Sequence, residues 1–114
     1  MVELRGSHCE PCEQGGPPLS EEDSARWALQ IPLWQRDRNL RIHREFRFDT
    51  FRDAFGLATR IALLAEAEGH HPDMEVGWGR VGVSLSTHSV AGLSRNDFIM
   101  AAKIDDLVLG GVAT

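Results

Sequence analysis

LRIHREFRF at residues 40–48 and DTFRDAFGLATRIALLAEAEG at residues 49–69 together decide the fold. The first stretch alternates apolar and polar side chains, with Arg44 interrupting the apolar series, and this period of two predicts a strand with one buried face. The second stretch predicts a helix over residues 50–68, because its apolar residues recur at helical spacing. Asp49 is the expected N-cap and Gly69 the expected end of this helix. Its expected apolar stripe consists of Phe51, Phe55, Ala58, Ile61, Ala62 and Ala65.

Further elements flank this central unit on both sides. Towards the N-terminus, Ser20 is the expected cap of a short helix that runs to about Gln30, and Arg36–Asn39 is expected to turn a hairpin. Towards the C-terminus, Met74–Trp78 and Arg80–Thr87 are the expected strands of a second pair. A last helix begins after Ser94, with Asp97 three residues later as in a capping box. This order predicts an α+β fold, a four-stranded antiparallel sheet with about three helices packed on one face.

Length and charge exclude several classes of protein. The chain has 114 residues, 12 Lys and Arg against 17 Asp and Glu, and a formal net charge of −5. One domain over residues 19–114 is therefore expected, and the acidic balance argues against direct nucleic-acid binding. The apolar runs are too short for a membrane span, and no secretory pattern is recognisable, so a cytoplasmic protein is expected.

Residues 1–18 have the composition of a poorly ordered tail that folding does not need. This segment holds both cysteines, Cys9 and Cys12, and is rich in Gly and Pro towards its end. A structural zinc site usually has four ligands, and the chain has no second cysteine pair. An inert tail, redox chemistry and a metal shared between subunits remain alternatives for the two cysteines.

Arginines crowd the region of the first predicted strand pair, interleaved with acidic residues. Two interpretations are open: a solvated face of mixed charge, or a surface for an anionic partner or substrate. The arginines are Arg36, Arg38, Arg41, Arg44, Arg47 and Arg52.

Three histidines stand at the ends of predicted elements. His70 and His71 follow the long helix and precede Pro72, and His88 ends the last strand. Imidazole exchanges protons near neutral pH, so these side chains suit general acid–base catalysis, and Glu66 is spaced to orient one of them. Pro72 restricts the backbone of His71, so the adjacent side chains are expected to point apart. A three-histidine metal site and a purely structural role are the alternatives.

The same residues carry a resemblance to a known family. The sequence EAEGHHPDMEVGWGRVGVSLSTHSVAGLSRND at residues 66–97 resembles the signature of the pterin-4a-carbinolamine dehydratases in residue type and in every interval. The matching positions are Glu66, His70, His71, Pro72, Trp78, His88 and Asp97. Similar features extend the resemblance over roughly Leu19 to Leu107.

The resemblance implies dehydration of a 4a-hydroxytetrahydropterin to quinonoid dihydropterin and water, without metal or cofactor. It implies His70 and His88 as the acid–base pair and His71 as the group that holds the 4a-hydroxyl. Glu66 and Asp97 would then be supporting carboxylates, and Pro72 belongs to the same motif. Outside the motif, Trp34 either packs against the pterin or fills the core, whereas Trp78 is interpreted as structural.

The resemblance also implies partners. Members of the family assemble as homodimers or homotetramers, so a homo-oligomer is expected. An enzyme of this kind would serve the aromatic amino acid hydroxylase pathway, which supplies its pterin substrate. The same scaffold occurs in a transcription coactivator and in Rubisco or carboxysome assembly factors, so a binding protein is the alternative. The complete histidine set favours the enzyme.

Overall fold

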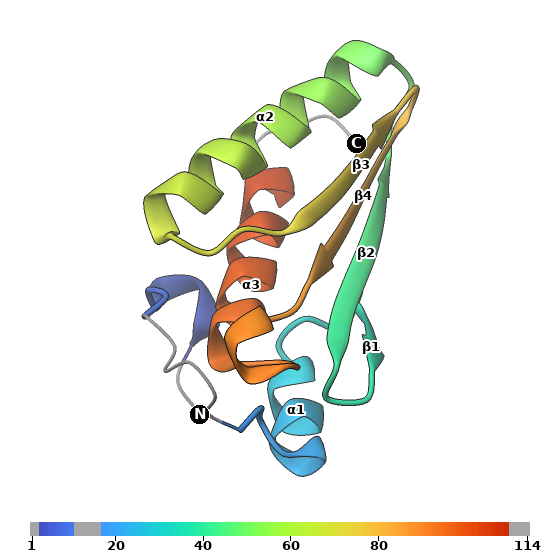
Figure 1. The fold of residues 1–114 in the computed structure, drawn as a ribbon. Coiled ribbons are helices and arrows are strands. Elements are labelled where there is room, and N and C mark those ends of the chain that lie inside the picture. The colour runs from blue at the N-terminus through green and yellow to red at the C-terminus, as the bar shows by residue number, and fades with distance from the viewer. Residues whose placement is uncertain (1–2, 11–16, 110–114) are drawn as a thin grey trace.

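The computed structural model describes residues 3–10 and 17–109, and Figure 1 shows its arrangement. A short 3-10 helix, η1 (Leu4–Gly6), precedes α1 (Glu21–Ala28) and the hairpin of β1 (Gln35–Asp37) and β2 (Arg41–Arg47). The long helix α2 (Phe51–Glu68) leads to β3 (Asp73–Gly77) and β4 (Arg80–Leu85). A second 3-10 helix, η2 (His88–Val90), leads into α3 (Arg95–Leu109).

The four strands form one antiparallel sheet in the order β1-β2-β4-β3. Helices α2 and α3 cover one face of this sheet, and α1 lies near the end that carries the β1–β2 hairpin (Figure 1). On the covered face, Ile42 lies opposite Leu85 and Phe46 opposite Val81, and all four side chains are buried. The predicted α+β fold is confirmed. Among the described residues, no helix combines the length and apolar character that a bilayer crossing requires.

Helix α2 begins one residue later than predicted and buries a partly different set of side chains. Thr50, not Asp49, is its N-cap, since the Thr50 hydroxyl accepts a hydrogen bond from the Asp53 N–H at 3.1 Å. The buried residues are Ala54, Leu57, Ala58, Ile61 and Ala65. Phe51 and Phe55 of the predicted stripe are instead exposed, by 49% and 55%. Ala58, Ile61 and Ala65 belong to both sets, whereas Ala54 and Leu57 are buried in place of Phe51, Phe55 and Ala62. The small alanines let the helix approach its neighbours closely.

Arg44, which interrupts the apolar pattern of β2, points its side chain towards the core side of the sheet. Its guanidinium lies 4.3 Å from the centre of the Phe46 ring and donates to the Asp105 carboxylate of α3 at 2.7 Å. The Trp34 indole N–H donates to the same carboxylate at 2.8 Å. Burial raises the pKa of Asp105, although these two donors oppose that shift. Arg44 therefore occupies an inward-facing position of the strand, where Asp105 balances its charge. The predicted alternation of β2 holds at this residue.

Most of the crowded arginines have acidic partners within the chain. Arg36 pairs with Glu21, Arg47 with Glu45 and Arg52 with Asp53. These pairs, together with Arg44 and Asp105, favour the interpretation of a mixed-charge face over an anion-binding surface.

The N-terminal segment differs from the poorly ordered tail predicted for residues 1–18. Over residues 3–10 it packs on the domain, and Leu4 is completely buried within the core. Residues 11–16, which include Cys12, lie outside the described residues. The prediction rested on the average composition of residues 1–18, to which the single residue Leu4 contributes little. In the structure the Leu4 side chain is nevertheless part of the hydrophobic core.

Candidate active site

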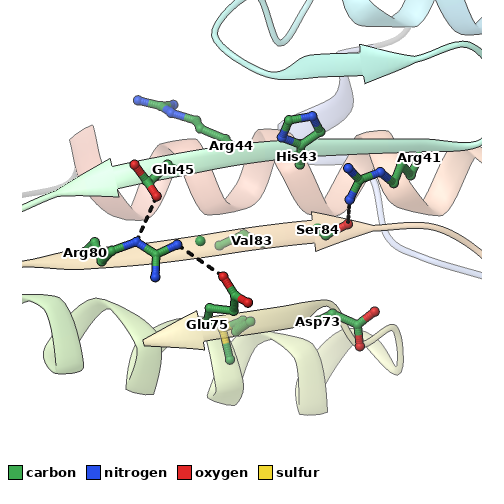
Figure 2. Close-up of a pocket in the computed structure, with 11 residues that line it drawn as sticks. Arg41, His43, Arg44, Glu45, Asp73, Glu75, Arg80, Val83 and Ser84 are labelled. Carbon is green, nitrogen blue, oxygen red and sulfur yellow. Dashed lines mark hydrogen bonds and ion pairs between the residues drawn. The ribbon is translucent and has the colours of Figure 1, made fainter. Parts of the chain in front are cut away.

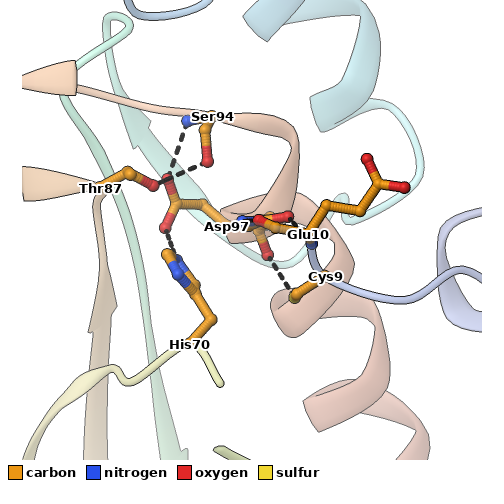
Figure 3. Close-up of polar contacts among 7 residues, drawn as sticks. Cys9, Glu10, His70, Thr87, Ser94 and Asp97 are labelled. Carbon is orange, nitrogen blue, oxygen red and sulfur yellow. Dashed lines mark hydrogen bonds and ion pairs between the residues drawn. The ribbon is translucent and has the colours of Figure 1, made fainter. Parts of the chain in front are cut away.

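Helix α2 ends in a geometry that aims His70 into the protein. Gly69 adopts the left-handed conformation, with φ 69° and ψ 26°, and its N–H donates to the Ala65 carbonyl. The chain therefore turns sharply at residue 69, as predicted. The next side chain, His70, is only 12% exposed, and its Nε2 lies 2.7 Å from Oδ1 of Asp97 (Figure 3).

Asp97 is a completely buried carboxylate with three hydrogen-bonding partners. Besides His70 on Oδ1, its Oδ2 accepts from the Thr87 hydroxyl at 2.7 Å and from the Ser94 N–H at 2.9 Å. The Ser94 bond is one half of the predicted capping box, while the Ser94 hydroxyl contacts Thr87 at 2.7 Å instead of closing the other half. An ionised Asp97 can only accept, so His70 donates from Nε2 and its Nδ1 is left for proton exchange.

A cavity of about 340 Å³ adjoins this hydrogen-bond chain, and we call it the His70 pocket. The N-terminal segment, the end of α2, the β4–α3 connection and α3 each contribute to its wall. Its lining residues are Cys9, Glu10, Glu68, Gly69, His70, Thr87, Ser89 and Asn96. A histidine held by a buried carboxylate at a cavity can take up or release a proton next to a bound small molecule.

His71 and Glu66 form a second, separate pair on the surface. Nε2 of His71 contacts Oε2 of Glu66, and the two side chains are 59% and 77% exposed. The adjacent imidazoles thus have different partners, as the constraint from Pro72 predicts. Glu66, which is spaced to orient one of the two imidazoles, contacts that of His71. Among the described residues, neither member of this pair lines the His70 pocket.

The remaining sequence-predicted residues are divided between the pocket's surroundings and the core. His88 is exposed at the start of η2, directly after the pocket residue Thr87, and Pro72 is half-buried in the loop before β3. Trp34 is buried with its indole bound to Asp105 and its ring edge-on to Phe46, so these contacts match the core-filling alternative. Trp78, interpreted as structural, is 73% exposed in the β3–β4 turn.

A second cavity, a polar groove of about 370 Å³, lies on the face of the sheet that the helices leave open (Figure 2). Gly82 and Ser84 of β4 are among its lining residues. Arg80 bridges Glu45 and Glu75 across it at 2.8 and 3.2 Å. Because the Arg80 guanidinium is already engaged by two carboxylates in the groove, the His70 pocket is the better candidate for chemistry.

No group of three or more His, Cys, Asp or Glu side chains among the described residues is placed to hold a metal ion. The three-histidine metal alternative therefore has no geometric support within that part of the chain. A site that includes Cys12 falls outside the described residues.

Sequence patterns missed several residues of the site. Thr87 and Ser94 hold Asp97, and Cys9, Glu68 and Asn96 line the pocket. Thr87 was predictable as a site residue, because it directly precedes the candidate His88 in the sequence. The contact between Cys9 and Glu68 joins residues 59 positions apart, so no local spacing predicts it.

Comparison with known proteins identifies the chain's relatives. The family profile described as pterin 4 alpha carbinolamine dehydratase matches residues 17–107. A Methylococcus capsulatus protein provisionally named as this dehydratase is 44% identical over 105 residues, which cover 91% of this chain and 92% of the relative. A Rubrobacter xylanophilus protein of the same provisional name is 43% identical, over 94% of this chain and 100% of its own.

Two solved structures share the fold. A transcriptional coactivator/pterin dehydratase from Brucella melitensis superposes with a TM-score of 0.74 at 35% identity, over 79% of this chain and 97% of that chain. A pterin dehydratase-like protein described as a RuBisCO assembly factor in the alpha-carboxysome gives 0.56 at 21% identity, over 65% and 87%. At that identity the second likeness shows the fold alone.

Proposed function

This chain belongs to the pterin 4 alpha carbinolamine dehydratase family, a family of hydro-lyases, and we propose that it dehydrates a 4a-hydroxytetrahydropterin. In this reaction the bond between C4a and the hydroxyl oxygen breaks. A proton delivered to that oxygen releases water, and the proton on ring nitrogen N5 is removed as a double bond forms between N5 and C4a. The product is a quinonoid dihydropterin. The proposal also includes a cytoplasmic, homo-oligomeric protein, as the sequence predicts.

The observation that carries the proposal is the buried contact between His70 and Asp97 at the wall of a cavity. We assign His70 as the base that takes the N5 proton through Nδ1. The imidazolium that forms would be stabilised by Asp97, whose charge has little water around it.

The exposed histidines complete the proposed proton transfers. His88 is assigned as the acid for the departing hydroxyl, and its exposure lets it exchange protons with water after each turnover. His71, supported by Glu66, is assigned to hold the 4a-hydroxyl. Both assignments follow the family motif, and His88 is further supported by its place beside Thr87.

A rate assay with freshly generated 4a-hydroxytetrahydropterin tests these roles. His70→Ala and His88→Ala should each slow dehydration by about 10²–10⁴-fold, the usual effect of removing one positioned acid or base. The double variant should lose less than the product of the two effects, because groups that act on one transition state work together. His43→Ala is the matched control, since this histidine lies in the polar groove.

Circular dichroism melts separate chemistry from folding in this test. Normal melts with slow rates support the proposal. Normal melts with normal rates would refute it and make a binding role the better candidate. A Rubisco assembly role has no specific support here, because the likeness to the assembly factor shows only the fold.

A further inference from the structure

The N-terminal segment over residues 3–10, here called the strap, is anchored at its beginning by a buried side chain. Leu4 is completely buried, and its N–H donates to Oε1 of Gln30 at 3.0 Å. Lys103 of α3 donates to the Arg5 carbonyl at 3.0 Å. The strap therefore lies along α3 in a fixed position, which matches its path in Figure 1.

Glu68 anchors the other end of the strap. Its side chain is 8% exposed and accepts hydrogen bonds from the Cys9 N–H at 2.8 Å and from His8 at 2.9 Å. Burial by itself would raise the pKa of this carboxyl. The Cys9 N–H, His8 and Lys103 outweigh that effect and hold the pKa below its ordinary value. Glu68 therefore keeps the charge that binds the strap.

Asn96 holds the next residue of the strap through both of its side-chain groups. Its Oδ1 accepts from the Glu10 N–H at 3.0 Å, and its Nδ2 donates to the Glu10 carbonyl. The Cys9 thiol also points to the Asn96 carbonyl, at 3.7 Å (Figure 3). Asn96 directly precedes Asp97, the partner of His70, so one turn of α3 holds both the strap and the proposed base.

These anchors place Cys9 and Glu10 in the wall of the His70 pocket, together with His70 itself. We propose that the strap is a substrate-binding wall of this pocket, and that Glu68 and Asn96 are positioning residues that hold it against the bound pterin. This inference rests on the proposed function. A wall that excludes water and restricts the ring should strengthen substrate binding, whereas proton transfer depends on the histidines.

The test uses Glu68→Ala and Asn96→Ala in the full chain, with Glu22→Ala as the matched control. Glu22 lies on α1, and its side chain is 87% exposed. The two strap variants should raise KM about tenfold, equivalent to about 1.4 kcal/mol of lost binding, and change kcat by less than about threefold. The dissociation constant for a stable dihydropterin that lacks the 4a-hydroxyl should rise by the same factor.

Labelling of Cys9 reports the strap itself, in a Cys12→Ser background. Burial, and then the nearby carboxylates of Glu68 and Asp97, raise the pKa of the Cys9 thiol to about 12, so a maleimide should react slowly. Release of the strap in either variant should accelerate labelling. Bound dihydropterin should slow it in the parent protein.

Each outcome decides between the proposals. Faster labelling with unchanged KM and dihydropterin affinity would show that the strap is no part of the binding site. Unchanged labelling would show that Glu68 and Asn96 do not hold it. Either result overturns this inference and leaves the dehydratase proposal intact. A parent protein that neither binds dihydropterin nor dehydrates the substrate overturns both.

Discussion

Asp97 combines a structural and a proposed chemical role in one carboxylate. Its Oδ2 caps the start of α3 through the Ser94 N–H, while Oδ1 meets Nε2 of His70. A helix N-terminus is a favourable place for an acidic side chain, and Asp97 lies in the first turn of α3. The contact with Oδ1 occupies Nε2 of His70, so Nδ1 is the ring nitrogen that Asp97 does not engage.

Asp97→Asn should separate these two roles. The amide oxygen of the introduced side chain would still accept from the Ser94 N–H, but the charge that supports a His70 imidazolium would be gone. We expect kcat to fall about 10²-fold or more, with the melting temperature lowered only slightly. Asp23→Asn is the control, because Asp23 lies in the first turn of α1, as Asp97 lies in that of α3, and its 45% exposed side chain pairs with Arg26. A wild-type rate in folded Asp97→Asn protein would show that Asp97 only caps the helix and takes no part in catalysis.

Sequence spacing predicted the local partner of Asp97 but not the distant one. Ser94 and Asp97 are three residues apart, so the cap was recognisable from one turn of helix. The contact with His70 spans 27 positions and depends on how α2 and α3 pack. The same reason applies to two glutamates at the end of α2. Spacing indicated that Glu66 would meet one of the two imidazoles, but only the packed structure shows that Glu66 contacts His71 and that Glu68 binds the strap.

At the scale of elements, the end of α2 sets the direction in which His70 leaves the helix. Gly69→Ala tests that dependence, because alanine at φ 69° is strained even though a Cβ there would meet no atom within 4 Å. We expect a loss of about 1 kcal/mol in the free energy of unfolding and a lower dehydration rate.

Gly56→Ala is the matched control, since Gly56 lies within α2 and a Cβ there would be 3.7 Å from the Arg60 guanidinium. This change should add about 0.5–1 kcal/mol of stability and leave the rate unchanged. Urea melts and the rate assay measure both effects. Equal stability changes in the two variants would contradict the backbone explanation for Gly69.

Helices and strands could be predicted where the local sequence signals agreed with one another. The prediction was wrong where two sets of residues on one helix had the same spacing. Strand alternation and the left-handed glycine gave β2 and the end of α2 close to their observed positions. The buried face of α2 was predicted wrongly in part, because Phe51 and Phe55 repeat as regularly as Ala54 and Ala58. Hydrophobicity favoured the phenylalanines, but close packing of α2 on the domain required the smaller side chains.

For the whole molecule, the consequence is an apolar strip left on the outside of α2. Phe51 and Phe55 stack with ring centres 5.8 Å apart, and Leu63 farther along the helix is 67% exposed. Contiguous exposed apolar side chains commonly mark an interface. The sheet offers a second candidate in its edge strand β3, where Val76 is 39% exposed. Either surface could form the homo-oligomer that the sequence predicts.

We expect the α2 strip to be the interface, because Phe51, Phe55 and Leu63 on this helix are each more exposed than Val76 on the β3 edge. Light scattering after size-exclusion chromatography should give a multiple of 12.7 kDa for the wild type. Phe55→Glu should lower that mass by placing a charge where the helices would meet. Leu29→Glu, at a leucine beyond α1 that is 77% exposed, should not change it. If Val76→Lys lowers the mass and Phe55→Glu does not, the sheet edge is the interface, and a single-chain mass for the wild type would exclude both.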